Sequence, residues 1–393
     1  MNDMRIAMIG QKGMPASHGG VERHVHDLSV ELAKTGHSVT VYSRSWYSQL
    51  SADATVEGVL VKHLPTLKTK HLDTISHALF ASFHALFQGY DVVHYHGVGP
   101  SLVSWIPRLF SKSKVVTTFH SIDRYHQKWG AFARLVLRLG EKAAVWFAHD
   151  TITVSRSLEM YCLNEFDQET VHIPNGVKKS NPTKDSTVLK KFGLKPNQYI
   201  LMVSRLVPHK GAHLLVEAFT ALKNANETNP AFTNLKLVIV GGSVYTNKYI
   251  ESLHEQAGQC NDIVFTDFQG GTALEALYQN SLVLVHPSLS EGLPITVLEA
   301  MSAEKPVLLS NIPEHLELIN NPECIFTQNN VAALTGTINK FLHLSPAEQS
   351  KLGEKNIAII ESGYRWEKLM PQIENVYLRK KSQHTSVLPA SAV

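Results

Sequence analysis

The sequence of 393 residues has little cysteine, little charge and no long apolar run. Its three cysteines lie far apart and form no CxxC pair: Cys162, Cys260 and Cys324. An odd, scattered set argues against a disulfide framework or a structural zinc site and fits a reducing compartment. No stretch of about 18 uncharged apolar residues predicts a membrane-spanning helix. The apolar opening, residues 4–10, is too short for a signal peptide, so we expect a cytoplasmic protein.

Charge is scarce and nearly balanced. There are 37 Lys and Arg against 34 Asp and Glu, and the net charge is +3. A surplus this small does not favour nucleic acid as a partner. Apolar residues make up 44% of the chain, which is enough for two packed cores. At roughly 150 residues per domain, the length also favours two domains.

Short β-branched runs alternate with longer segments of helical period, which predicts an α/β fold with parallel, doubly wound sheets. The first half has predicted strands at Arg5–Ile9, Ser38–Ser43, Gly58–His63, Asp91–Tyr95, Lys114–Phe119, Asp150–Val154 and Thr170–Ile173. The second half has them at Tyr199–Ser204, Leu235–Val240, Asp262–Thr266, Leu282–His286, Pro306–Ser310 and Glu323–Phe326. Helices are expected between these strands, among them one over Pro100–Phe110.

A polar segment with Pro and Gly, residues 175–185, is typical of a linker between two domains. We expect an N-terminal domain over residues 1–178 and a C-terminal domain over 195–362. A helix over 363–381 is expected to pack back on the N-terminal domain, and the small polar tail 382–393 to be disordered. Ligands bind at the carboxyl ends of parallel strands, so both domains should offer loops to one cleft.

The first predicted strand leads into a loop that ends in Gly19 and Gly20, directly before a helix. The glycine spacing is not GxGxxG, and no acidic residue closes the second strand, which disfavours a nicotinamide site. Bare backbone N–H groups at the positive end of a helix still allow a phosphate to approach. A long flexible turn is the alternative interpretation.

The strand at Tyr199–Ser204 is followed by Arg205 and, five positions later, by Lys210 next to a helix start. Because both residues lie close to the end of the same strand, Arg205 and Lys210 can bind the same anion. A planar guanidinium and a compact ammonium form a suitable pair for a diphosphate. Two solvated surface cations are the alternative.

The strongest signal is a strand–helix turn bracketed by Glu291 and Glu299. Gly292, followed by Leu293, lets a ligand approach the backbone, and Pro294 suits the first turn of a helix. An ionised carboxylate accepts two hydrogen bonds, so Glu299 could hold a ribose diol, as acidic residues do in dinucleotide sites.

The sequence has two His-x-His pairs, His24 with His26 and His94 with His96. They are only a weak indication of a metal site, because such a site needs at least three ligands and the spacing identifies no third one. His94 and His96, at a strand end, are better suited to binding acceptor hydroxyls or to satisfying a local turn. We therefore expect no metal site.

The segment 124–147 mixes basic and aromatic residues at helical period, and Trp129, Phe132, Val136 and Leu139 share a face. Such a helix can lie on an anionic membrane surface as a peripheral contact. Burial of that face on its own domain is the commoner outcome.

Together these motifs resemble the retaining glycosyltransferases of family 4, which adopt the GT-B fold of two Rossmann-like domains facing a central cleft. The similarity covers about residues 4–375, and it implies that the domain over 1–178 binds the acceptor and the domain over 195–362 binds the nucleotide sugar. It also rests on the first-half segments Gly19–Glu22, His94–Ser101, Thr118–His120, Val154–Ser155 and Ile173–Val177. A narrower likeness is to bacterial enzymes that build polysaccharide or lipopolysaccharide, including rhamnosyl-type transferases.

The resemblance implies roles for the second-half motifs. Arg205 and Lys210 would hold the nucleotide diphosphate, and Glu299 the ribose. Glu291 would meet the donor sugar together with the backbone at Gly292 and Leu293.

In the first half, the resemblance implies that His120 lies at the reacting centre, while Gly19 and Gly20 approach the phosphates or the acceptor. Fixed cations stabilise the charge that develops on a leaving diphosphate. No two aspartates stand two apart to hold a divalent ion, so Arg205 and Lys210 are the expected charge sink. No cofactor beyond the nucleotide-sugar donor is expected. Whether Glu291 acts as a covalent nucleophile stays open.

The expected function is retaining, metal-independent sugar transfer from a nucleotide-diphosphate sugar to a glycan or lipid-linked acceptor in bacterial surface polysaccharide synthesis. A nucleotide-sugar epimerase of the same fold and a non-catalytic nucleotide-sugar-binding partner are the alternatives. Uridine, guanosine and thymidine donors are all compatible with the motifs.

Overall fold

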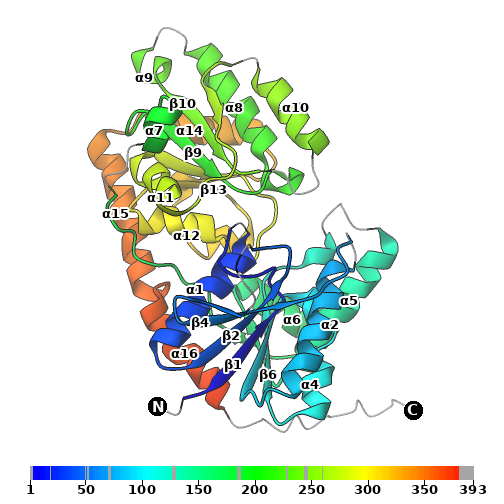
Figure 1. Ribbon diagram of the computed structural model, residues 1–393. Helices are drawn as coiled ribbons and strands as arrows, with labels where there is room; N and C mark the ends of the chain where they lie inside the picture. Colours follow the sequence, from blue (N-terminus) through cyan, green and yellow to red (C-terminus); the bar gives the residue numbers. More distant parts are fainter. Residues whose placement is uncertain are drawn as a thin grey trace.

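A computed structural model describes residues 3–17, 19–48, 50, 53–69, 72–125, 130–183, 187–226, 229–242, 247–258 and 260–379. The chain folds into two α/β lobes, with two long helices passing along one side of both (Figure 1). We use "first lobe" for the part around the sheet of residues 5–172 and "second lobe" for the part around the sheet of residues 199–326. No helix within the described ranges combines the length and the apolar character needed to cross a bilayer.

The first lobe contains an eight-stranded sheet of order β3-β4-β2-β1-β5-β6-β7-β8. All neighbouring strands are parallel except β3 and β4. The strands are β1 Arg5–Ile9, β2 Ser38–Arg44, β3 Ala54–Val56, β4 Val59–Leu64, β5 Val92–His96, β6 Lys114–Phe119, β7 Asp150–Thr153 and β8 Val171–His172. The helices are α1 Gly20–Lys34, α2 Asp73–Leu86, α3 Val98–Ser101, α4 Trp105–Phe110, α5 Ala131–Trp146 and α6 Arg156–Phe166, with a short 3-10 turn at Asp123–Tyr125.

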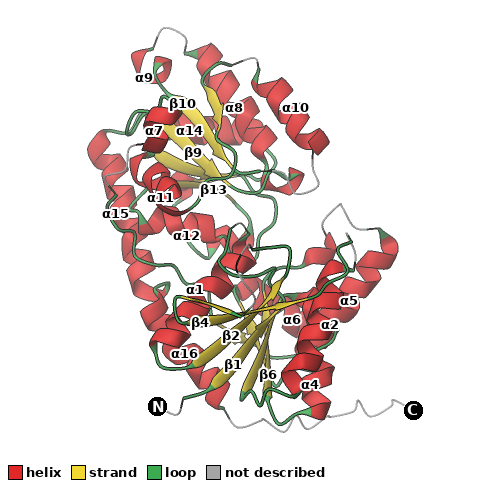
Figure 2. Cartoon of the chain, in the orientation of Figure 1, coloured by secondary structure: helices red, strands yellow, loops and turns green. Residues whose placement is uncertain are grey.

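Alternation along β1 divides the core of this lobe between the two faces of the sheet. Ile6 and Met8 belong to one apolar cluster, while Ala7 and Ile9 belong to another. The first cluster includes residues of α1 and the second residues of α2, so helices cover both faces (Figure 2). This is the packing that successive side chains on opposite faces of a strand require.

The second lobe contains a six-stranded, fully parallel sheet of order β11-β10-β9-β12-β13-β14. The strands are β9 Tyr199–Val203, β10 Lys236–Val240, β11 Ile263–Phe265, β12 Val283–His286, β13 Val307–Ser310 and β14 Ile325–Phe326. The helices are α7 Thr187–Lys191, α8 Ala212–Ala225, α9 Pro230–Thr233, α10 Asn247–Ala257, α11 Gly271–Asn280, α12 Ile295–Ser302, α13 Pro313–Leu316, α14 Val331–Leu342 and α15 Pro346–Gly363. Short 3-10 turns lie at Pro208–Lys210 (η2) and Pro322–Cys324.

The final helix, α16 Trp366–Leu378, returns to the first lobe. Its apolar residues share a cluster with those of α1 and β1, and the Tyr377 hydroxyl bonds the Nδ1 atom of His94 at 2.8 Å. Gly176 makes room for this return, because a Cβ there would lie 2.4 Å from the ring of Trp366. The tail 382–393 lies outside the described residues.

The predicted α/β class with two parallel, Rossmann-like sheets is confirmed. Two local predictions are wrong. The strand β3 was not predicted; it pairs antiparallel with β4 through a turn in which Glu57 and Gly58 both have positive φ, the geometry of a two-residue hairpin. The helix predicted over Pro100–Phe110 is instead two short helices, α3 and α4.

Candidate active site between the two lobes

His120 lies where β6 of the first lobe ends, and a loop of the second lobe packs directly on it. A Cβ on Gly292 would lie 1.6 Å from the carbonyl oxygen of His120, so only glycine permits this contact. Asn175 adds a second tie, because its Nδ2 donates to the carbonyl oxygen of Leu293 at 2.8 Å. The Gly292–Leu293 turn and His120, assigned to one site on the resemblance, are therefore neighbours.

The His120 imidazole is buried. Burial lowers its pKa well below the ordinary value, and the neighbouring His24 and His94 lower it further. The ring is therefore neutral at pH 7, with one nitrogen that donates and one that accepts a hydrogen bond.

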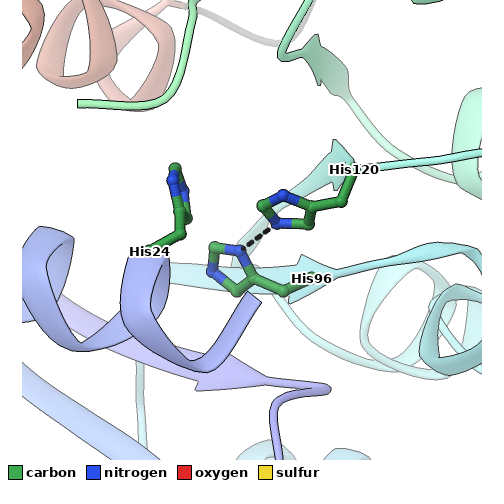
Figure 3. A group of neighbouring side chains, drawn as sticks. All are labelled: His24, His96 and His120. Atoms are coloured by element: carbon green, nitrogen blue, oxygen red, sulfur yellow. Dashed lines mark hydrogen bonds between the residues drawn. The ribbon is translucent and has the colours of Figure 1, made fainter. Parts of the chain in front are cut away.

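Two further histidines meet His120 (Figure 3). Nδ1 of His96 and Nε2 of His120 are 3.3 Å apart, and the rings of His24 and His120 have centroids 4.8 Å apart. His24, His96 and His120 form a group whose ligand nitrogens all lie within 4.8 Å of one another. The sequence motifs suggested His24 and His96 separately but did not bring them together with His120.

Lys210 and Glu291 form an ion pair between the turn after β9 and the loop after β12. Lys210 Nζ lies 2.5 Å from Glu291 Oε1, and the same oxygen lies 2.8 Å from Nε2 of His286. Burial by itself raises the pKa of Glu291, but the Lys210 ammonium and the His286 hydrogen bond outweigh it and hold that pKa well below its usual range. Burial lowers the pKa of Lys210, and Glu291 opposes that shift. The predicted cation and the predicted glutamate therefore act as one unit.

Arg205 is exposed on the same turn. Its charge contributes to lowering the pKa of Lys210, after the larger effect of burial, so the two cations are near enough to act on one anion. The turn is fixed against the β12 loop at Gly211, whose φ is +72° and whose Cβ would lie 2.2 Å from the carbonyl oxygen of Pro287. Because β9 and β12 are adjacent, their end loops meet at one edge of the sheet.

Glu299 lies on α12 and faces the first lobe. The Tyr278 hydroxyl donates to its Oε2 at 3.0 Å, and Arg23 Nε lies 3.8 Å from its Oε1. Burial raises the pKa of Glu299, and the Arg23 charge opposes this. Arg23 was missed by sequence reasoning. Its position in the first turn of α1, three residues after Gly20, was the available signal.

The glycine pair opens α1. Gly19 has φ +104°, and a Cβ there would lie 2.0 Å from Oε2 of Glu22, whose side chain folds back over it. Gly20 has no atom within 4 Å of a Cβ position. The exposed backbone at the helix start is thus Gly20, while Gly19 is screened by a carboxylate.

Comparisons with known proteins cover nearly the whole chain. Residues 18–180 match the family described as Glycosyltransferase Family 4, and residues 186–359 match the one described as Glycosyl transferases group 1. An uncharacterized glycosyltransferase of Methanocaldococcus jannaschii is 27% identical over 338 residues, 81% of this chain and 83% of that protein. O-antigen chain mannosyltransferase C of Escherichia coli is 23% identical, with 95% and 98% covered.

Solved structures show the same architecture. Sucrose-phosphate synthase from Thermosynechococcus elongatus superimposes with a TM-score of 0.78 at 22% identity, covering 95% of this chain and 98% of that one. HepE of Anabaena, solved with UDP-glucose, has a TM-score of 0.75 at 19% identity, with 95% and 99% covered. The fold is therefore GT-B. With the two family matches, the chain is a glycosyltransferase of the family 4, GT-B type.

Proposed function

We propose that this glycosyltransferase moves a sugar from a nucleotide-diphosphate donor to a glycan or lipid-linked acceptor, with retention at the anomeric carbon and without a metal ion. The strongest support for this proposal is the contact between Gly292 of the second lobe and the backbone of His120 in the first. The ion pair of Lys210 and Glu291 lies on the same loop as Gly292. Groups suited to the diphosphate, the sugar and the reacting bond thereby lie around one lobe boundary.

Lys210 and Arg205 are assigned to the diphosphate. An ammonium has three N–H donors, and the contact with Glu291 uses one of them while fixing its position. The remaining donors and the exposed Arg205 guanidinium are suited to phosphate oxygens. As the bond between sugar and diphosphate breaks, negative charge grows on the leaving oxygen, which fixed cations stabilise without reorganisation.

Glu291 and Glu299 are assigned to hydroxyl groups of the donor. The ionised Glu291 carboxylate can accept bonds from the sugar, and Glu299, oriented by Tyr278, can accept bonds from the ribose diol. The backbone at Gly292 and Leu293 completes the sugar site, and Gly20 offers the exposed helix start to the phosphates or the acceptor.

The proposed reaction is a displacement on the same face of the sugar. The bond from the anomeric carbon to the phosphate oxygen breaks through an oxocarbenium-like state, and the acceptor oxygen forms the new glycosidic bond. The acceptor proton passes to the leaving phosphate. His120, neutral and next to the second lobe, orients the donor sugar in this scheme.

The relatives support a role in surface polysaccharide synthesis, with hexosyl or deoxyhexosyl transfer, because two of them are named for O-antigen synthesis: a mannosyltransferase and WclY of Escherichia coli. Solved neighbours contain UDP-glucose or ADP, which supports a nucleotide-sugar donor and leaves the base open.

We further propose a cytoplasmic protein that touches the anionic inner face of a membrane through α5, within the segment 124–147. Of the predicted face, Phe132 is 79% exposed and Leu139 is exposed, whereas Val136 is half-buried. The neighbouring Leu135 is 57% exposed. Burial on its own domain, the commoner outcome, therefore does not occur for Phe132 and Leu139. Arg134 and Lys142 lie on the same helix, and apolar and basic side chains together favour an anionic interface. Trp129 lies outside the described residues.

The test of the transfer reaction is incubation with UDP-, GDP- and dTDP-sugars and candidate acceptors in the presence of EDTA, followed by NMR of the product. We expect a new glycoside with the anomeric configuration of the donor. Inversion would contradict retention. Isomerised sugar formed without acceptor would instead favour the epimerase.

A further inference from the structure

His24, His96 and His120 come from three separate elements and converge at the lobe boundary (Figure 3). His24 lies on α1, His96 ends β5 and His120 directly follows β6. All three are buried, and one ring nitrogen from each can be chosen so that the three atoms lie within 4.8 Å of one another.

The distances approach those of a metal site. Two imidazole nitrogens bound tetrahedrally to zinc at about 2.0–2.1 Å lie roughly 3.4 Å apart. Nδ1 of His96 and Nε2 of His120 are 3.3 Å apart, so this pair already has the required spacing. His24 then needs only a small ring movement to bring its nitrogen to the same ion.

His24 has a buried nitrogen whose hydrogen bonding is incomplete. Among the described residues its Nδ1 atom has no partner of good hydrogen-bond geometry, although the Asn175 side chain lies close enough to favour the protonated ring and so to raise its pKa. Coordination to an ion gives a buried nitrogen of this kind a well-placed partner.

The surroundings hold the rings in place. His94 packs against His96, with tilted rings whose centroids are 4.1 Å apart. Both nitrogens of His94 are engaged, one by the Tyr377 hydroxyl and the other by Oγ1 of Thr118. His94 is thus a support and not a ligand. Nε2 of His96 contacts the sulfur of Met8 at 3.4 Å, so Nδ1, which faces Nε2 of His120, is the nitrogen that an ion between the two rings would bind.

We propose that His24, His96 and His120 bind one divalent transition-metal ion, with water as the fourth ligand, and that this ion withdraws His120 from the sugar site. Three imidazoles and no carboxylate favour zinc, cobalt, nickel or copper over magnesium and calcium, which prefer oxygen ligands. The ion is an inhibitor of transfer and not a cofactor, because coordination through Nε2, the nitrogen that faces His96, fixes the His120 ring toward His24 and His96 and keeps it from turning to the donor.

The first test uses the full-length protein, freed of metal with EDTA and dialysed, and cobalt(II) chloride as the probe. Tetrahedral cobalt bound by imidazole shows visible d–d absorption without a thiolate charge-transfer band. We expect one cobalt per chain, displaced by zinc. The variants His24→Gln and His96→Gln should each weaken binding about tenfold or more, given that even supporting residues contribute 10–100-fold.

The matched control is His343→Gln, an exposed histidine of the second lobe whose Nδ1 bonds the carbonyl oxygen of Asn339. It should bind cobalt as the parent does. Urea unfolding of every variant shows that it is folded. Absence of the tetrahedral spectrum in the parent, or an equal spectrum in the His24→Gln and His96→Gln variants, would overturn the site.

A second test separates this inference from the proposed function. Zinc chloride should inhibit sugar transfer by the parent, EDTA should restore it, and His24→Gln should require about tenfold more zinc for the same inhibition. Full activity with zinc bound would overturn the inhibitory role. If no transfer is found with any donor, the proposed function fails, while the cobalt spectrum still decides whether the ion site exists.

Discussion

The carboxylate of Glu317, in the second lobe, caps the helix that begins at Arg156 in the first lobe. Its Oε1 accepts the backbone N–H of Ser157 at 2.8 Å and its Oε2 that of Arg156 at 2.9 Å. Glu314 adds a bond from the Ser157 hydroxyl at 2.7 Å. The start of α6 is thus satisfied from the other lobe, so this contact connects the two lobes.

Replacing Glu317 by Ala should therefore weaken the folded state. The change leaves two N–H groups at a helix start without their acceptor, and we expect a loss of about 1–2 kcal/mol in the free energy of unfolding. Urea denaturation measures it. Glu354→Ala, an exposed glutamate on α15, is the control and should leave stability within about 0.5 kcal/mol. Equal stability of both variants would show that the cap contributes nothing.

Replacing Arg205 by Ala should weaken binding of nucleoside diphosphates. A charged hydrogen bond contributes about 1.5–3 kcal/mol, so we expect roughly a tenfold to hundredfold loss of affinity, measured by calorimetry with UDP, GDP and dTDP. Lys340→Ala removes an exposed cation of the same lobe and should have no effect.

The double variant Arg205→Ala, Lys210→Ala should lose affinity and turnover together. Lys210→Ala by itself also removes the cation beside Glu291, so the pKa of that carboxyl should rise. Parent-like transfer by the double variant would refute the assignment of the two cations to the diphosphate.

Replacing Gly292 by Ala should lower turnover more than it lowers nucleotide affinity. The added Cβ cannot stand 1.6 Å from the His120 carbonyl oxygen, so the loop and His120 must separate. A displacement of this kind can reduce the rate by up to about 10²-fold. Steady-state kinetics with varied donor separates kcat from KM. Gly336→Ala on α14, where a Cβ meets nothing within 4 Å, should behave as the parent.

The pH dependence of stability should carry a contribution from His77. Burial, followed by the charge of Arg44, lowers the pKa of His77 from 6.5 to about 4. Below pH 6.5 the unfolded chain takes up a proton at this position, while the folded chain takes one up only near pH 4. Stability from this group is therefore full above pH 6.5 and declines as the pH falls to 4, by about 1.4 kcal/mol per pH unit.

Urea denaturation of the parent and of His77→Asn at pH 7, 6 and 5 tests this. The variant should show a shallower decline between pH 6 and pH 5, whatever its stability at pH 7. Parallel curves for the two proteins would mean that His77 titrates alike in both states.

Membrane contact through α5 is testable with vesicles of phosphatidylglycerol and phosphatidylcholine. Sedimentation of the parent should increase with the anionic fraction and fall with salt, because screening weakens the attraction to basic residues. The double variant Phe132→Ser, Leu135→Ser should stay in the supernatant, whereas Leu378→Ser, an exposed leucine at the end of α16, should sediment as the parent. Sedimentation of the double variant would exclude this face.

The sequence by itself determined the α/β class, because the alternation of short β-branched runs with helical segments is a local property of the chain. It also placed Arg205 and Lys210 after the strand β9, Glu291 after the strand β12 and Glu299 on the helix that follows β12. Their roles toward a donor stay predictions. The hairpin of β3 and β4 was not predicted, because the turn residues Glu57 and Gly58 are only a weak sequence signal for a two-residue turn.

Only the tertiary structure decided which of these side chains meet. Lys210 faces Glu291 because β9 and β12 are neighbours in the sheet, although 81 residues separate the two side chains. Arg23 faces Glu299 because α1 and α12 oppose each other across the lobe boundary. His24, His96 and His120 converge because the order β1-β5-β6 brings three strand-end segments to one edge. Hydrophobic periodicity specifies each element locally, whereas contacts between elements depend on the strand order and on how the lobes pack, which no local pattern encodes.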